Sequence, residues 1–272
     1  MNTVNSRQNI DIALECQTSA RYYYDRADLL DNIYWFGILT TIILKFIWIN
    51  NIWIDYALIL WFFITLLLDT YISTYTSSAS QFKQIFDEYV FGWKENFSNE
   101  TIQKINILKS KNKSMFDKQM SHTGNDNFRG VKDWYEFVDD EDNQNEAIQK
   151  SIRESVYYDN SINQTLLIIL VILTVFTLIY FRNTTLTIYL KTIFLVLSNL
   201  SKKVVTTLLK SLRVNRLNKE INIRLDLAKT NDDFKEIQNI IFMKRQISGV
   251  TPNWIYYIRK NKITKLASYL FP

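Results

Sequence analysis

The sequence predicts an all-α integral membrane protein built from two transmembrane helical hairpins (four spans), with helical cytoplasmic extensions. Apolar residues gather in two blocks, Ile33–Leu68 and Leu166–Leu200, and charged residues fill the rest of the chain. Its 272 residues include only five Gly and two Pro, so long helices can run without interruption. A helix over the whole first block would be about 54 Å long, whereas the hydrocarbon core of a bilayer is about 30 Å thick. The chain must therefore turn inside this block.

The first hairpin turns at two adjacent asparagines. Asn50-Asn51 divides the block into Ile33–Ile49 and Ile52–Leu68. Asparagine tolerates left-handed backbone and its side chain bonds the local backbone, so a tight helix–helix turn fits this position. Each half is then long enough for one short span.

The second block repeats this plan. Leu166–Phe181 is a run of apolar residues, with two threonines but no charge, and is the clearest span in the sequence. Arg182–Thr185 then turns the chain into Leu186–Leu200. We therefore expect four spans arranged as two hairpins.

Lysine and arginine predict the orientation, because they are retained on the cytoplasmic side. Three precede Ile33, eleven lie between Ser73 and Ile162, and fifteen follow Leu200, whereas the two predicted turns carry only Arg182. Both termini are therefore expected in the cytoplasm of a multi-pass protein of the bacterial inner membrane. The predicted parts are an N-terminal cytoplasmic amphipathic helix (1–32), hairpin one (33–72), a cytoplasmic helical segment (73–162), hairpin two (163–200) and a basic cytoplasmic helical tail (201–272).

Four charged residues lie in or beside the apolar blocks, and two interpretations stay open for them. They can mark hairpin ends, where long side chains reach the lipid headgroups. They can also line or gate the mouth of a pore when several copies assemble, because charge near a membrane core is costly and commonly functional. These residues are Lys45, Asp55, Asp69 and Lys191.

The tail after the fourth predicted span is strongly basic, with fifteen Lys and Arg against five Asp and Glu. One interpretation is a patch that attracts anionic membrane lipid, at about 1 kcal/mol per basic residue near the surface. The other is that some of these side chains bind an anionic nucleotide. The candidate contacts are Lys202, Lys203, Lys210 and Arg213.

Apolar spacing predicts helices in the cytoplasmic parts. They cover Asn9–Asp31 running into the first span, Ser80–Ser98, a segment from Gln144 into the third span, and Asp232–Gln246. His122–Gly130 is expected to be a loop.

Motifs of the common enzyme classes are absent from the sequence. It has no nucleotide-binding glycine loop and no nucleophile elbow, and its single histidine lies in a polar segment. The acidic run Asp139–Asp142 does not have the spacing of a calcium loop. An enzyme and a metal site are therefore not predicted.

An ordered set of motifs resembles the SMODS-associating four-transmembrane effectors, predicted pore-formers encoded beside bacterial cyclic-oligonucleotide synthases in anti-phage systems. The set comprises "RQN" (Arg7, Gln8, Asn9), "SARYYYDRAD" before the first span, "IFDEYVFGW" ending at Trp93, "DWY" (with Trp134 and Tyr135), "IQKS" (with Gln149), "IQNIIFMKR" (with Gln238 and Arg245) and "TPNWIYYIRK" (with Pro252, Trp254 and Tyr257). The chain departs from the family at Glu136, where proline is frequent, and at Ile148, where the family has cysteine.

The resemblance implies a membrane effector that stays silent until infection. A cyclic oligonucleotide made by a partner synthase would activate it, and a homo-oligomeric pore would then disrupt the inner membrane and cause abortive infection. Membrane lipid would be its other partner, with no role for DNA, RNA or a resident cofactor. The alternative from a different class is a non-conducting membrane scaffold or sensor that recruits a cytoplasmic partner.

Overall fold

The computed structural model describes residues 2–48, 51–124, 126, 128–180, 194–248, 259, 262–263, 265–266 and 269, and within these ranges every regular element is a helix. An isolated bridge joins Thr123 to Lys132. The fold class is therefore all-α, as predicted. The helices are α1 (Thr3–Arg7), α2 (Asp11–Ile47), α3 (Ile52–Val90), α4 (Asn99–Lys111), α5 (Lys113–Met120), α6 (Gln144–Tyr180), α8 (Phe194–Leu227) and α9 (Asn231–Ser248).

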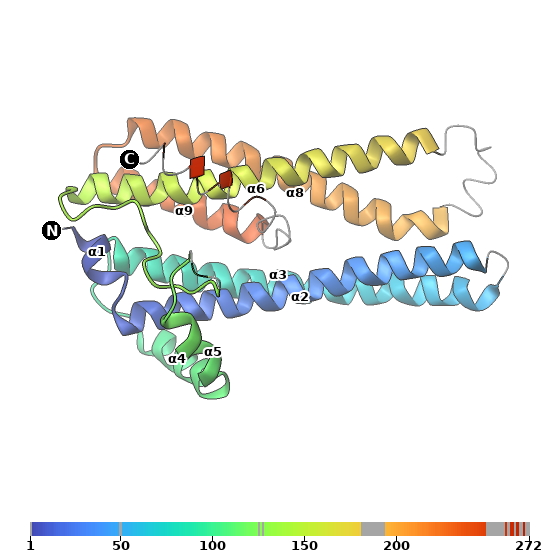
Figure 1. Ribbon diagram of the computed structural model, residues 1–272, viewed down its shortest axis with the longest axis horizontal. Helices are drawn as coiled ribbons and strands as arrows, with labels where there is room; N and C mark the ends of the chain where they lie inside the picture. Colours follow the sequence, from blue (N-terminus) through green and yellow to red (C-terminus); the bar gives the residue numbers. More distant parts are fainter. Residues whose placement is uncertain are drawn as a thin grey trace.

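Helices α2 and α3 form one long antiparallel pair, the first helix pair (Figure 1). The break between them comes where the two asparagines predict it: α3 begins after Asn51, whose side chain accepts a hydrogen bond from the backbone nitrogen of Trp53 at 2.9 Å. This is an N-cap, which satisfies one of the free N–H groups of the first turn. Asn50 lies outside the described residues.

A glycine allows the first helix pair to pack closely. A Cβ atom at Gly37 would lie 1.8 Å from the indole ring of Trp61, so the ring rests directly on the α2 backbone. Further along the pair, Tyr34, Ile38 and Ile72 are buried with Ala27. Close backbone approach of this kind is common between membrane helices, whose association depends on packing rather than on exclusion of water.

Helices α6 and α8 form the second helix pair beside the first (Figure 1). Leu166, Leu170 and Val204 pack between them, and the amide of Asn163 donates to the backbone oxygen of Ser211 at 2.9 Å. The turn predicted at Arg182–Thr185 lies outside the described residues, as does much of the fourth predicted span. Of the described residues, two helices, α2 and α3, are long and apolar enough to cross a membrane.

Large apolar side chains cover the outer surface of the first helix pair. Phe36, Leu60, Phe63, Leu67 and Trp53 are each more than half exposed. A water-facing protein seldom presents so large an apolar surface, whereas lipid tails cover it without cost. The helix tips are therefore the part that suits a bilayer.

The other end of the molecule, the membrane-distal bundle, holds the main core. It joins the far ends of α2, α3, α6 and α8 to α1, α4, α5 and α9 (Figure 1). Phe86, Phe116, Ile148 and Phe234 are among its fully buried side chains.

The helix predicted over Ser80–Ser98 is shorter than expected. It is the end of α3 and stops at Val90, because Gly92 adopts a left-handed backbone with φ of 75°. The backbone nitrogens of Gly92 and Trp93 return to the carbonyls of Tyr89 and Glu88 at 3.1 and 2.9 Å. This is a glycine-terminated helix end of the Schellman type, and it places Trp93 against the core beyond the helix.

Candidate functional site

A buried carboxylate, Asp87 of α3, is the centre of the polar contacts in the membrane-distal bundle. It accepts hydrogen bonds from the hydroxyl of Tyr135 at 2.6 Å, the amide of Gln238 at 2.8 Å and the guanidinium of Arg245 at 2.6 Å. The ammonium of Lys83 lies 3.3 Å away. Asp87 is 1% exposed, so these partners replace water completely. The network joins α3 and α9 to the segment between α5 and α6.

Burial and neighbouring charge act in opposite directions on this network. Burial raises the pKa of Asp87, but the Arg245 and Lys83 cations outweigh it, and the net pKa lies below its usual value. Burial lowers the pKa of Lys83 to about 7 despite the opposing Asp87 charge. The Lys83 ammonium also lies 4.3 Å from the ring centres of both Phe86 and Trp134. Asp87 is therefore ionised at neutral pH, whereas Lys83 gains or loses its proton near neutral pH.

The N-terminal "RQN" residues pair with the "DWY" residues through backbone and side-chain amides. Gln8 accepts from the backbone nitrogen of Tyr135 at 2.9 Å, and Asn9 both donates to and accepts from Asp133, at 2.6 and 3.0 Å. Asp133 has a left-handed backbone with φ of 50°, which these bonds hold in place. Arg7 donates to the carbonyl oxygens of Tyr89 and Lys94, at 3.2 and 3.0 Å.

The remaining motif residues are structural where they are described. Gln149 donates to the backbone oxygen of Leu225 at 2.9 Å, which ties α6 to α8, and Trp93 packs on the core. Pro252, Trp254 and Tyr257 lie outside the described residues. The motif side chains thus mostly bond one another or the backbone.

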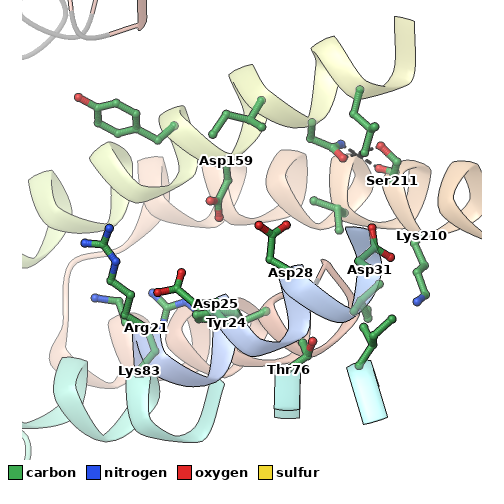
Figure 2. Close-up of a pocket in the computed structure, with 18 of the residues that line it drawn as sticks. Arg21, Tyr24, Asp25, Asp28, Asp31, Thr76, Lys83, Asp159, Lys210 and Ser211 are labelled. Atoms are coloured by element: carbon green, nitrogen blue, oxygen red, sulfur yellow. Dashed lines mark hydrogen bonds between the residues drawn. The ribbon is translucent and has the colours of Figure 1, made fainter. Parts of the chain in front are cut away.

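A large cavity lies beside this network, between the two helix pairs. Its volume is about 1240 Å³, and α2, α3, α5, α6, α8 and α9 all contribute to its wall. Figure 2 shows Asp25, Asp28 and Asp31 along one face of α2, with Asp159 of α6 opposite them. Spacing of three residues places the α2 carboxylates on one side of the helix.

Cations balance several of the cavity carboxylates. Lys203 pairs with Asp31, and Lys244 pairs with Asp159 at 2.7 Å. Burial raises the pKa of Asp25, and the nearby guanidiniums of Arg21 and Arg129 only partly oppose it. The interior of the cavity is therefore polar without a large excess of positive charge.

Four buried side chains in the cavity wall each carry an oxygen that no described residue hydrogen-bonds. They are 2 to 5% exposed: Gln17 (Oε1), Thr76 (Oγ1), Gln119 (Oε1) and Glu154 (Oε2). Burial raises the pKa of Glu154 to about 8, the neighbouring Glu136 charge adds to this rise, and backbone hydrogen bonds from Glu136 and Phe137 partly oppose it. Buried polar atoms are normally hydrogen-bonded, so a cluster of open ones in a cavity is typical of a binding site.

Two ion pairs connect the helix pairs at the edge of the cavity nearest the spans. Lys202 and Lys203 of α8 bind Asp69 of α3 and Asp31 of α2, the first pair at 2.9 Å. We refer to these four residues as the lysine clamp. The Lys203 ammonium also lies 4.3 Å from the ring centre of Tyr34 and is largely buried.

The candidate charged residues that are not part of the lysine clamp lie elsewhere in the structure. Lys45 and Asp55 bind each other at 2.6 Å near the tip of the first helix pair. Lys210 and Arg213 lie at the cavity wall with exposed side chains, and Lys191 lies outside the described residues. The structure thus places seven of the eight candidate charges, either around the cavity or, for Lys45 and Asp55, near the tip of the first helix pair.

Sequence reasoning missed several residues of this site. Asp87 lies inside the "IFDEYVFGW" motif, so the motif could have singled it out as a charge within an apolar stripe. Asp25, Asp28 and Asp31 are three residues apart, so the sequence could have predicted that they share one face of a helix. Nothing local distinguishes Glu154 or Gln119, because their burial depends on helices that are distant in sequence.

Comparison with known families decides the identity of the chain. A family model described as the SMODS-associating 4TM effector domain matches residues 2–269. The chain belongs to this family. It is therefore a membrane effector associated with SMODS-type signalling, as the motif resemblance predicts. No curated protein and no solved structure matches it.

Proposed function

We propose that this effector is the membrane-permeabilising component of a nucleotide second-messenger anti-phage system. The cytoplasmic bundle receives a cyclic oligonucleotide made by a partner synthase, and the helix pairs then rearrange and oligomerise into a pore in the inner membrane. The family supports the signalling role, and the exposed apolar tips support the membrane role.

The lysine clamp is the observation that carries this proposal. Its two ion pairs join the helix pairs at the edge of the cavity, where Leu200 and Trp35 also pack between them. A buried ammonium without its carboxylate is strongly unfavourable, by about 3–5 kcal/mol, so Lys203 favours the closed arrangement. Separation of the pairs requires these bonds to break, which makes the clamp a suitable point of control.

Four helices packed together leave no aqueous channel, so conduction needs several copies of the chain. The pairing of Lys45 with Asp55 neutralises both charges near the tips in a single copy. In an oligomer the same residues, with Asp69 and Lys191, face the lumen, because a charge facing lipid near the core costs about 2.5–3.5 kcal/mol. The tips are then the outer mouth of the pore.

The test is membrane depolarisation in cells that co-express the chain with an active or an inactive synthase. We expect depolarisation and cross-linked oligomers with the active enzyme alone. Asp31→Asn and Asp69→Asn should depolarise cells even with the inactive enzyme. Asp226→Asn is the matched control, since it removes an exposed pair with Arg153 between α6 and α8.

Absence of depolarisation with the active synthase would replace this proposal by the non-conducting scaffold. Clamp variants that stay silent and behave like Asp226→Asn would remove the clamp from the mechanism.

Orientation is tested separately with single cysteines in a Cys16→Ser background. Asn51→Cys should react with a membrane-impermeant maleimide from outside, whereas Asn112→Cys should react only after permeabilisation. External labelling at residue 112 would contradict the cytoplasmic placement of the bundle.

A further inference from the structure

The cavity between the helix pairs has two chemically different parts. Exposed cations lie on α8 at its wall, and open, buried oxygens line its interior. We propose that the cavity is the ligand site of the chain and takes a nucleotide with amino-bearing bases: the phosphates bind Lys210 and Arg213, and the base amino groups bind the interior oxygens. This inference rests on the proposed function, in which a nucleotide activates the effector.

The α8 cations suit phosphate. Lys210 and Arg213 are three residues apart on α8, so they share one face of the helix. Both are exposed, and within the described residues neither forms an ion pair. Arginine in particular binds phosphate through two parallel N–H groups. Lys203, deeper in the cavity, is already bound to Asp31.

The interior disfavours phosphate and favours hydrogen-bond donors. Asp25, Asp28 and Asp31 of α2 face Asp159 of α6 across it (Figure 2). Lysines already bind Asp31 and Asp159, and a phosphate beside the row of α2 carboxylates would be repelled. The open amide oxygens of Gln17 and Gln119 are acceptors for a ligand N–H, and the Thr76 hydroxyl and the Glu154 carboxyl can accept one as well as donate. A ligand with an anionic part and an amino-bearing ring satisfies both regions.

The open oxygens also determine specificity. A buried acceptor left without a donor costs about 1–3 kcal/mol, so a base that supplies an amino group is favoured over one that does not. Adenine, cytosine and guanine carry an exocyclic amino group with two N–H donors, whereas uracil has a carbonyl oxygen where cytosine has its amino group and offers only one ring N–H. The cavity should therefore reject uracil. Its volume, about 1240 Å³, exceeds the roughly 300–1,000 Å³ of sites for drug-sized ligands and leaves room for two nucleotides.

The ligand reaches the lysine clamp from this position. Asp31, Lys203 and Asp69 are themselves part of the cavity wall. A nucleotide that fills the cavity therefore contacts the ion pairs that join the helix pairs. Nucleotide binding and separation of the two helix pairs therefore involve the same ion pairs.

The test measures binding to the full-length protein in neutral detergent micelles by calorimetry. The probes are cyclic di-AMP, cyclic tri-AMP and cyclic di-UMP, with inorganic triphosphate as an anion without a base. We expect at least one adenine probe to bind at least tenfold more tightly than cyclic di-UMP and triphosphate. Comparable affinities for the adenine and uracil probes, or no binding of any probe, would overturn the inference.

Matched variants locate the site. Lys210→Gln with Arg213→Gln should weaken adenine-probe binding at least tenfold. Arg216→Gln with Lys219→Gln removes the same charge from exposed α8 residues outside the cavity and should change it less than threefold. Equal weakening by both pairs would indicate a general basic surface and overturn the inference.

Two further experiments test whether the interior oxygens recognise the base and whether the α8 cations bind a lipid headgroup instead of the nucleotide. Thr76→Val with Gln17→Leu should weaken the adenine probe and leave cyclic di-UMP unchanged. Phosphatidylglycerol in the micelles should not displace the probe, and full displacement would assign the α8 cations to a lipid headgroup instead. Synthase-dependent depolarisation is measured independently, so it can persist when the cavity inference fails.

Discussion

Two polar regions lie side by side in the membrane-distal bundle, and they differ in how their groups are satisfied. Around Asp87, four partners from α3, α9 and the segment between α5 and α6 surround both carboxylate oxygens, and only Lys83 Nζ and Gln238 Oε1 of this network lack a hydrogen bond among the described residues. In the adjoining cavity, Gln17, Thr76, Gln119 and Glu154 keep open oxygens. A closed network stabilises one arrangement, whereas open buried groups cost stability and are retained where a ligand completes them. The first region therefore maintains the fold, and the second provides the site.

Removal of the central carboxylate should have the largest effect. Asp87→Ala leaves Arg245 and Lys83 buried without their common partner, which costs about 3–5 kcal/mol. We expect a marked loss of folded protein and a lower Tm in detergent. Glu141→Gln, at an exposed residue of the loop before α6, is the control and should match the parent. A stable Asp87→Ala protein would mean that the network is not structural.

Loss of one hydroxyl from the closed network should have a smaller effect. Tyr135→Phe removes the hydrogen bond to ionised Asp87, and such bonds contribute about 1.5–3 kcal/mol. Thermal unfolding should show this destabilisation while nucleotide binding, measured well below the Tm, stays close to that of the parent. A large loss of binding without destabilisation would place Tyr135 in the site rather than in the scaffold.

The pH dependence of stability should report Glu154. Its folded pKa is about 8, above the ordinary value of 4.5, so the folded state holds more protons than the unfolded state between these values. The contribution of Glu154 to stability should therefore be greatest below about pH 4.5 and decrease as pH rises through this window, by up to about 1.4 kcal/mol per pH unit.

Glu154→Gln should flatten this dependence of stability on pH between about pH 5 and 6, a window that lies below the main titration of Lys83, whose pKa is about 7. Tm measured across that range provides the comparison. An unchanged slope in the variant would show that Glu154 is ionised and solvated in the folded protein.

Removal of a hydroxyl from the open region should have the smallest effect, with the opposite sign to Tyr135→Phe. Thr76→Val replaces an unpartnered, 2% exposed hydroxyl by a methyl group of similar size. We expect unchanged stability or a gain of up to about 1 kcal/mol, because no bond is lost and a buried polar atom is removed. Destabilisation by more than about 1 kcal/mol would show that the hydroxyl is bonded and the cavity is not open there.

The long helices could be predicted from the sequence because their signals are local. Apolar blocks, the Asn51 cap and the start of α6 at Gln144 all follow from neighbouring residues. The early end of α3 was missed, although Gly92 was visible, because the apolar stripe continues through it to Trp93. The resemblance led to the family through its ordered motifs.

The site was less accessible to sequence reasoning. Lys202, Lys203, Lys210 and Arg213 were identified as one basic group, but the structure divides them between the lysine clamp and the exposed part of the cavity wall. Glu154 and Thr76 are distant in the chain and line the same cavity only when the helices pack. Their burial is a property of tertiary structure, so no local pattern carries it.

Helix α3 runs for 39 residues without a break, from the tip at Ile52 to the Asp87 network. At 1.5 Å per residue it is a rod about 58 Å long. A rod of this length works as a lever with its anchored end in the buried core. Tilting it by about 5° at that end displaces the tip sideways by about 5 Å, roughly half of the 8–10 Å that separates the axes of packed helices. A small adjustment in the bundle is thereby amplified into a change of helix packing at the opposite tip.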